Sequence, residues 1–141
     1  MFSNNIMSSA GTIMSVYMTN TTTCVTGDGT VYQLIFDTVD FDLDSNYNTN
    51  TGLFTASSTG YYFVNTKLYI GNQVDIRLND SIQIRIVTPR INYDSFPTIS
   101  GIFIDSNFFN ITHSALVYLA IGDTVSIELT ITCGGKNCQI M

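Results

Sequence analysis

The chain has 141 residues, of which 45% are hydrophobic and 11% are charged, and its formal net charge is −6. This length fits one domain with a substantial core, and the hydrophobic content excludes a disordered chain. Nucleic acid is excluded as a partner, because binding to phosphates needs clustered basic side chains and the five here are scattered.

The charged fraction is less than half of the roughly 25% found in ordinary soluble domains, which indicates that part of the surface is buried in an assembly. The longest apolar run, residues 115–121, is too short to span a bilayer, so we expect no membrane insertion. The first eleven residues have neither the basic region nor the apolar core of a secretory signal. With an odd cysteine count (Cys24, Cys133 and Cys138), this favours reduced thiols.

In chain order, residues 1–11 are predicted to be an N-terminal arm or tether, and residues 12–141 to be the folded domain. Turn-forming residues separate short strands throughout, and no segment shows a sustained helical period. The predicted strands are 12–19, 31–36, 61–70, 81–88, 90–96, 99–104, 113–121 and 124–132. The fold class is therefore all-β, a sandwich or jelly roll of two antiparallel sheets.

The segment from Phe36 to Tyr62 places aromatic residues between turn-forming ones, which is typical of the corner of a β-sandwich. It also carries a spaced motif, read at Phe36, Asp42, Tyr47, Phe54, Gly60 and Tyr62. This motif resembles that of the complement C1q-type globular head, a jelly roll related to tumour necrosis factor. The chain departs from the family pattern at Val64 and Thr66, where aromatic residues are usual, and resembles it again at residues 120–125.

The predicted strands 61–70 and 113–121 carry apolar residues on both faces, although each sheet of a two-layer sandwich has only one dry face. The second face needs a partner, and the resemblance implies a homotrimer. Tyr62 or its neighbours and Tyr118 are expected near subunit contacts. The predicted interface residues are Tyr62, Val64, Leu116, Tyr118 and Ala120.

Asp40, Asp42 and Asp44 are spaced two apart, as oxygen ligands are in calcium loops. Some members of the resembled family bind calcium. The run lacks the glycine and the glutamate of such a loop, since Ser45 and Thr51 stand at those positions. The alternative is an acidic, solvated loop in which Asp42 caps a turn.

Cys133 and Cys138 flank a Gly-Gly pair that predicts a hairpin turn, and the two thiols are expected to be small buried groups. A disulfide or half a zinc site are the alternatives. The only histidine, His113, opens a predicted strand and is expected to be a structural or surface residue. No nucleophile elbow, phosphate loop or paired carboxylates are visible, so we expect neither an enzyme nor a cofactor.

The resemblance also implies a last strand with an aromatic-Ser-Gly signature, lying centrally between strands 12–19 and 61–70. The sequence ends at Met141 without this signature. Three outcomes follow: the chain is a fragment, residues 139–141 begin a strand completed by another chain, or the arm fills the slot through Phe2 and Ile6. The first is favoured, because residues 133–141 look like an interrupted hairpin.

The predicted function is a non-enzymatic structural and binding module, the trimeric head of a viral or phage fibre or surface protein. Residues 24–38, CVTGDGTVYQLIFDT, are similar to stand-alone heads of this kind. Such a head lies on the particle surface, where it attaches to a host receptor or glycan or to other particle proteins. The alternatives are a cellular, secreted and lectin-like C1q-type protein, or a jelly-roll capsid subunit.

Overall fold

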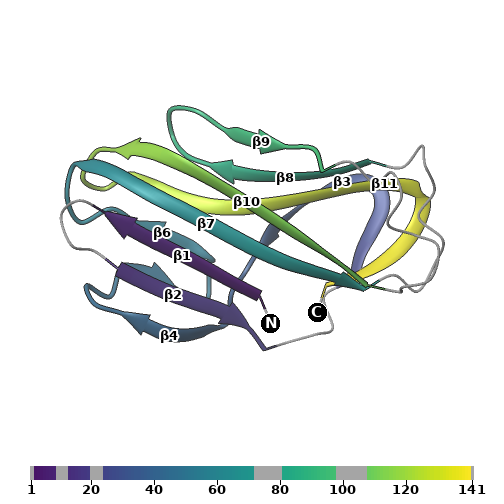
Figure 1. Ribbon diagram of the computed structural model, residues 1–141, viewed down its shortest axis with the longest axis horizontal. Helices are drawn as coiled ribbons and strands as arrows, with labels where there is room; N and C mark the ends of the chain where they lie inside the picture. The colour runs from purple at the N-terminus through teal and green to yellow at the C-terminus, as the bar shows by residue number, and fades with distance from the viewer. Residues whose placement is uncertain (1, 9–12, 20–23, 72–80, 98–107, 141) are drawn as a thin grey trace.

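The computed structural model describes residues 2–8, 13–19, 24–71, 81–97 and 108–140 (Figure 1). These residues form β-strands that are joined in one hydrogen-bonded network and folded into two layers around a shared core, and the predicted all-β class is confirmed. One layer contains, in spatial order, β4 (Thr38–Asp42), β2 (Ile13–Met18), β1 (Phe2–Ser8), β7 (Gly60–Gly71) and β10 (Phe108–Leu119). The other contains β3 (Cys24–Leu34), β5 (Tyr47–Asn48), β6 (Leu53–Thr55), β8 (Ser81–Val87), β9 (Tyr93–Ser95) and β11 (Thr124–Ile140).

The second layer is built around β11, which pairs with β8 and β3 along most of its length and with β6 at its start. All of these pairings are antiparallel, as are those in the first layer. Within the described ranges no helix is present that would be long and apolar enough to cross a membrane.

Alternating side chains fill the space between the layers. The predicted alternation in β8 is confirmed, since Ile82, Ile84 and Ile86 are buried and the residues between them are half-buried. In β7 the even-numbered residues from 62 to 70 point inward, including Thr66. The strand period of two therefore sends every second residue of these strands into one shared core.

The motif residues of the predicted corner hold it together. Phe36, Phe54 and Tyr62 are buried in the core, and the rings of Phe54 and Tyr62 meet edge to face with centroids 5.7 Å apart. The Asp42 carboxylate accepts a hydrogen bond from the Tyr47 backbone N–H (2.8 Å), and the Tyr47 phenol oxygen accepts one from the Phe36 N–H (3.0 Å). Burial raises the pKa of Tyr47 to about 12, against the lowering effect of the Phe36 bond.

β1 occupies the centre of its layer, so the prediction of a loose arm is wrong for residues 2–8. It pairs with β2 on one side and β7 on the other, and the buried Ile6 lies opposite both Met14 and Val64. Figure 1 shows β1 lying between these two strands. Of the three outcomes for the expected slot, the third is present: a strand does separate β2 from β7, and the N-terminal segment supplies it.

β11 continues to Ile140 instead of turning at the Gly-Gly pair, so the hairpin predicted at residues 133–138 is wrong. Its pairing with β3 shifts register between Thr132 and Asn137 and then resumes. The partner strand β3 extends far enough to keep pairing, which carries the chain through the irregular stretch. The last residues of β11 reach β7, where Ile140 lies opposite Ile70.

Two further boundaries differ from the prediction. β10 begins at Phe108 instead of His113, because it pairs with β7 along that strand's full length. The strand predicted at residues 90–96 is reduced to β9, and the one predicted at 99–104 lies outside the described residues.

Candidate functional site

The outward side of β7 and β10 carries a cluster of exposed apolar side chains, which we call the aromatic face. Its members are Tyr61 (57% exposed), Phe63 (45%), Leu116 (61%) and Tyr118 (42%). The strand register places Tyr118 directly opposite Tyr61, and Leu116 directly opposite Phe63. Directly opposed side chains on one face of a sheet are close neighbours, so the four form one continuous surface.

Cationic and polar groups flank the aromatic face. The rings of Tyr61 and Tyr118 meet edge to face with centroids 5.2 Å apart, and the Arg90 guanidinium lies 5.6 Å from the Tyr118 centroid. Arg90 also pairs with Asp123, at 3.5 Å between Nε and Oδ2. Protein–protein interfaces are enriched in aromatic and arginine side chains, so this composition is typical of an interface.

The predicted interface residues divide between the core and the surface. Tyr62 and Val64 are fully buried within the chain, so their assignment to a subunit contact is corrected: the odd-numbered neighbours in β7 face outward instead. The hydroxyl of Tyr62 donates to the Ser58 carbonyl at 2.7 Å. Leu116 and Tyr118 are exposed as an interface requires, and Ala120 is half-buried at the turn after β10.

The three carboxylates proposed as calcium ligands are not brought together. No group of three His, Cys, Asp or Glu side chains among the described residues has the arrangement of a metal site, and Asp40, Asp42 and Asp44 all belong to that set. Asp42 instead holds the Tyr47 backbone through Oδ2, while its Oδ1 is buried without a hydrogen-bond partner. The alternative weighed from the sequence, Asp42 as a capping residue, describes its position better.

His113 has a structural contact: its Nε2 lies 2.9 Å from the Tyr93 carbonyl oxygen, which ties β10 to β9. A nearby ion pair joins Arg85 to Asp94 at 2.6 Å, and the hydrogen bond lowers the pKa of Asp94 and raises that of Arg85. The side chains of Cys24, Cys133 and Cys138 lie outside the described part of the chain, so the predictions made for their thiols remain predictions.

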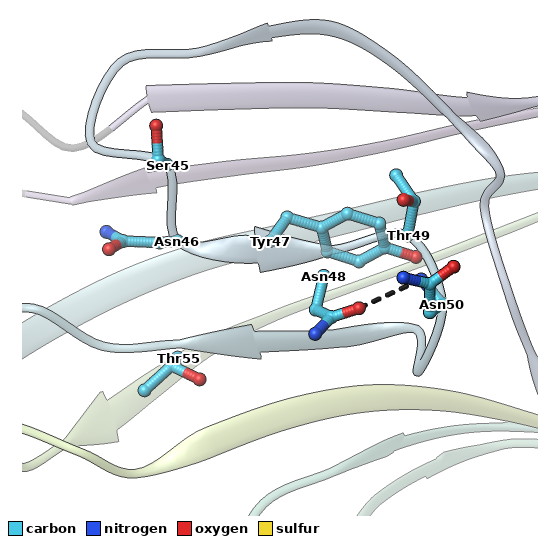
Figure 2. A pocket seen from close by; sticks show the side chains of 7 residues that line it. All are labelled: Ser45, Asn46, Tyr47, Asn48, Thr49, Asn50 and Thr55. Carbon is cyan, nitrogen blue, oxygen red and sulfur yellow. Dashed lines mark hydrogen bonds between the residues drawn. The ribbon is translucent and has the colours of Figure 1, made fainter.

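A second feature is an open hollow of about 490 Å³ beside the β5–β6 hairpin, which we call the polar hollow. Figure 2 shows its lining, made of the amide, hydroxyl and phenol side chains of Ser45, Asn46, Tyr47, Asn48, Thr49, Asn50 and Thr55. It was not among the sites predicted from the sequence. The signal was present, however, as asparagine at every second position from 46 to 50 around one tyrosine.

The polar hollow and the aromatic face both lie on the outside of a β-sandwich. A family model described as the C1q domain matches residues 15–139, and the chain belongs to this family. C1q and tumour-necrosis-factor-like domains are non-enzymatic binding modules, typically trimeric and typically extracellular or secreted. The chain is accordingly a non-enzymatic module.

Solved structures show the same fold at low sequence identity. The globular domain of zebrafish complement 1qA protein is 13% identical, with a TM-score of 0.54 and coverage of 99% of this chain and 94% of that one. Murine APRIL at pH 5.0 is 7% identical, with a TM-score of 0.54 and coverage of 99% and 98%. Murine APRIL at pH 8.5 is 8% identical, with a TM-score of 0.52 and the same coverage. No curated protein matches the chain in sequence.

Proposed function

We propose that the chain is one subunit of a homotrimeric binding head, assembled through the aromatic face. The observation that carries this proposal is the exposure of four large apolar side chains in register on β7 and β10. A contiguous apolar patch of this kind on a soluble protein marks an interaction site. Because domains of this family are typically trimeric, we expect two further copies of the chain to cover this patch.

The low charge of the chain supports assembly. Only 11% of its residues are charged, so burial of surface in an assembly desolvates few charged side chains. Two cations already have partners within the protomer: Arg90 contacts Tyr118 and Asp123, and Lys67 of β7 lies 5.1 Å from the centroid of Tyr69. Burial of the face therefore leaves these two cations with partners.

Light scattering after size-exclusion chromatography tests the assembly. We expect a mass three times that of the 15.6 kDa protomer at micromolar concentration. A monodisperse monomer under these conditions would overturn the proposal.

The setting we propose for this head is the surface of a viral or phage particle, in host attachment or decoration. The similarity of residues 24–38 to stand-alone fibre heads supports this setting. Antibodies against the trimer should label purified particles in electron micrographs and reduce attachment to host cells. The chain's presence in culture medium without particle labelling would instead favour a secreted cellular protein, the setting of C1q domain proteins generally.

A further inference from the structure

The polar hollow is built on a hairpin whose shape is fixed by internal hydrogen bonds. The Asn48 carbonyl accepts from the backbone N–H groups of Thr51 (3.3 Å) and Gly52 (2.8 Å), and the Gln33 side chain donates to the Thr51 carbonyl at 2.5 Å. On the other side, the Thr55 N–H donates to the Asn46 carbonyl at 2.8 Å. A loop fixed in this way loses little conformational freedom when a ligand binds, which favours binding.

The same internal bonds orient the two amide side chains. Asn48 Oδ1 accepts from the backbone N–H groups of Asn50 (2.9 Å) and Thr51 (3.2 Å), which leaves its Nδ2 group as a donor. Figure 2 shows this nitrogen on the side of Asn48 that faces away from Asn50 and toward Thr55. Asn46 Nδ2 donates to Ser57 at 3.0 Å, so its Oδ1 remains as an acceptor. Within the described chain, no further hydrogen bond occupies either of these two groups.

The lining contains donors, acceptors and one aromatic ring, but no charge. The Tyr47 hydroxyl is held by the Phe36 N–H, which fixes the ring among the polar groups. The volume of the polar hollow lies within the range of small-molecule sites, but such sites are usually enclosed and apolar, whereas this one is open and polar. A rigid polyol matches it, since hydroxyl groups both donate and accept and a sugar's C–H face packs on an aromatic ring.

From this arrangement we infer that the polar hollow binds a neutral monosaccharide unit of a glycan. A neutral sugar is preferred to an acidic one, because Asp44 immediately precedes the lining in sequence and the chain carries a net charge of −6. The inference rests on the proposed function in giving the binding head its ligand. All the lining residues belong to one protomer, however, so failure to bind sugar and failure to form a trimer are separately visible.

Saturation-transfer NMR with methyl glycosides of neutral hexoses and N-acetylhexosamines tests the inference on the full chain, and calorimetry then gives the dissociation constant. Asn48→Asp is the sharpest variant, because it keeps the Oδ1 acceptor that holds the turn and replaces the amide donor with an anionic oxygen. Loss of one such hydrogen bond should weaken binding by about tenfold or more. Thr55→Val removes one exposed lining hydroxyl at nearly constant volume and should also weaken binding.

Asn92→Asp is the matched control, because Asn92 is an exposed loop residue outside the hollow and the variant adds the same charge. It should bind the sugar as the wild type does. The inference is overturned if no neutral glycoside receives saturation transfer, if Asn48→Asp binds as tightly as Asn92→Asp, or if only sialylated glycosides bind.

Discussion

Substituting aspartate for Leu116 should dissociate the assembled head without unfolding its protomers. Leu116 is 61% exposed in the protomer, and complete burial of a leucine side chain contributes about 1.5–3 kcal/mol. Burying the remaining surface in an assembly therefore contributes about 1–2 kcal/mol per subunit, or about 3–6 kcal/mol per trimer. The aspartate variant loses this burial free energy, and it also has to place an unpaired carboxylate in a contact without water, which is unfavourable.

Each 1.4 kcal/mol corresponds to a tenfold change in an equilibrium constant, so assembly should weaken by at least about a hundredfold. Sedimentation velocity over a concentration series measures this, and circular dichroism reports whether the protomer still folds. Leu43→Asp is the matched control, because Leu43 is 68% exposed but lies in the turn after β4. If Leu116→Asp remains trimeric at every concentration, or if Leu43→Asp dissociates equally, the aromatic face is not the contact.

Three other substitutions test the fold around the sites. Gly52→Ala should lower the free energy of unfolding by about 1–3 kcal/mol more than Gly122→Ala does. Both glycines have positive φ, but a Cβ at Gly52 would lie 2.8 Å from a backbone oxygen, whereas a Cβ at Gly122 would meet open space. Equal midpoints of urea unfolding would contradict this. Asp42→Ala should lower the free energy of unfolding by about 1.5–3 kcal/mol, because it removes a charge-assisted hydrogen bond, and Asp42→Asn should restore much of this loss. Thermal unfolding measures both variants, and equal melting temperatures would contradict the expectation. The Arg85 bond depresses the pKa of Asp94 in the folded state, so the stability it adds is present above the unfolded value of 3.8 and is lost as pH falls through the folded pKa; urea unfolding of Asp94→Asn should lose less stability between pH 5 and pH 2 than the wild type does, and identical profiles would refute this.

Most of the sandwich is predictable from local pattern, because alternation and turn chemistry act within a few residues. The isoleucines of β8 alternate with polar residues, and the Gly122 turn shows its positive φ and its Asp123 N–H bond to the Ala120 carbonyl. The corner predicted from its aromatic and turn-forming residues is also present, with Phe36 and Phe54 of the motif buried in it. In each case the sequence itself contains the interaction that decides the structure.

The errors in the prediction arise where contacts between residues distant in sequence determine the structure. At the start of β7, residues 61–64 are large and apolar on both faces, so alternation within them cannot distinguish Tyr62, which is buried, from Tyr61, which is exposed. The long extent of β11 depends on β3, and the place of β1 depends on β7. The polar hollow escapes prediction because it combines side chains with backbone bonds that form only once the hairpin has closed.

The central place of β1 has a consequence for the order in which the molecule folds. Its pairing with β2 is local, since Met7 lies opposite Ile13, so this hairpin can form soon after synthesis of its residues. Its other edge matches residues 62–67 of β7 and must wait until the ribosome has delivered that strand. Non-local strand pairing of this kind slows folding, because the long loop must be closed before its contacts form. The nascent hairpin therefore exposes an unpaired edge during translation, which is the interval when chaperones protect such edges from aggregation.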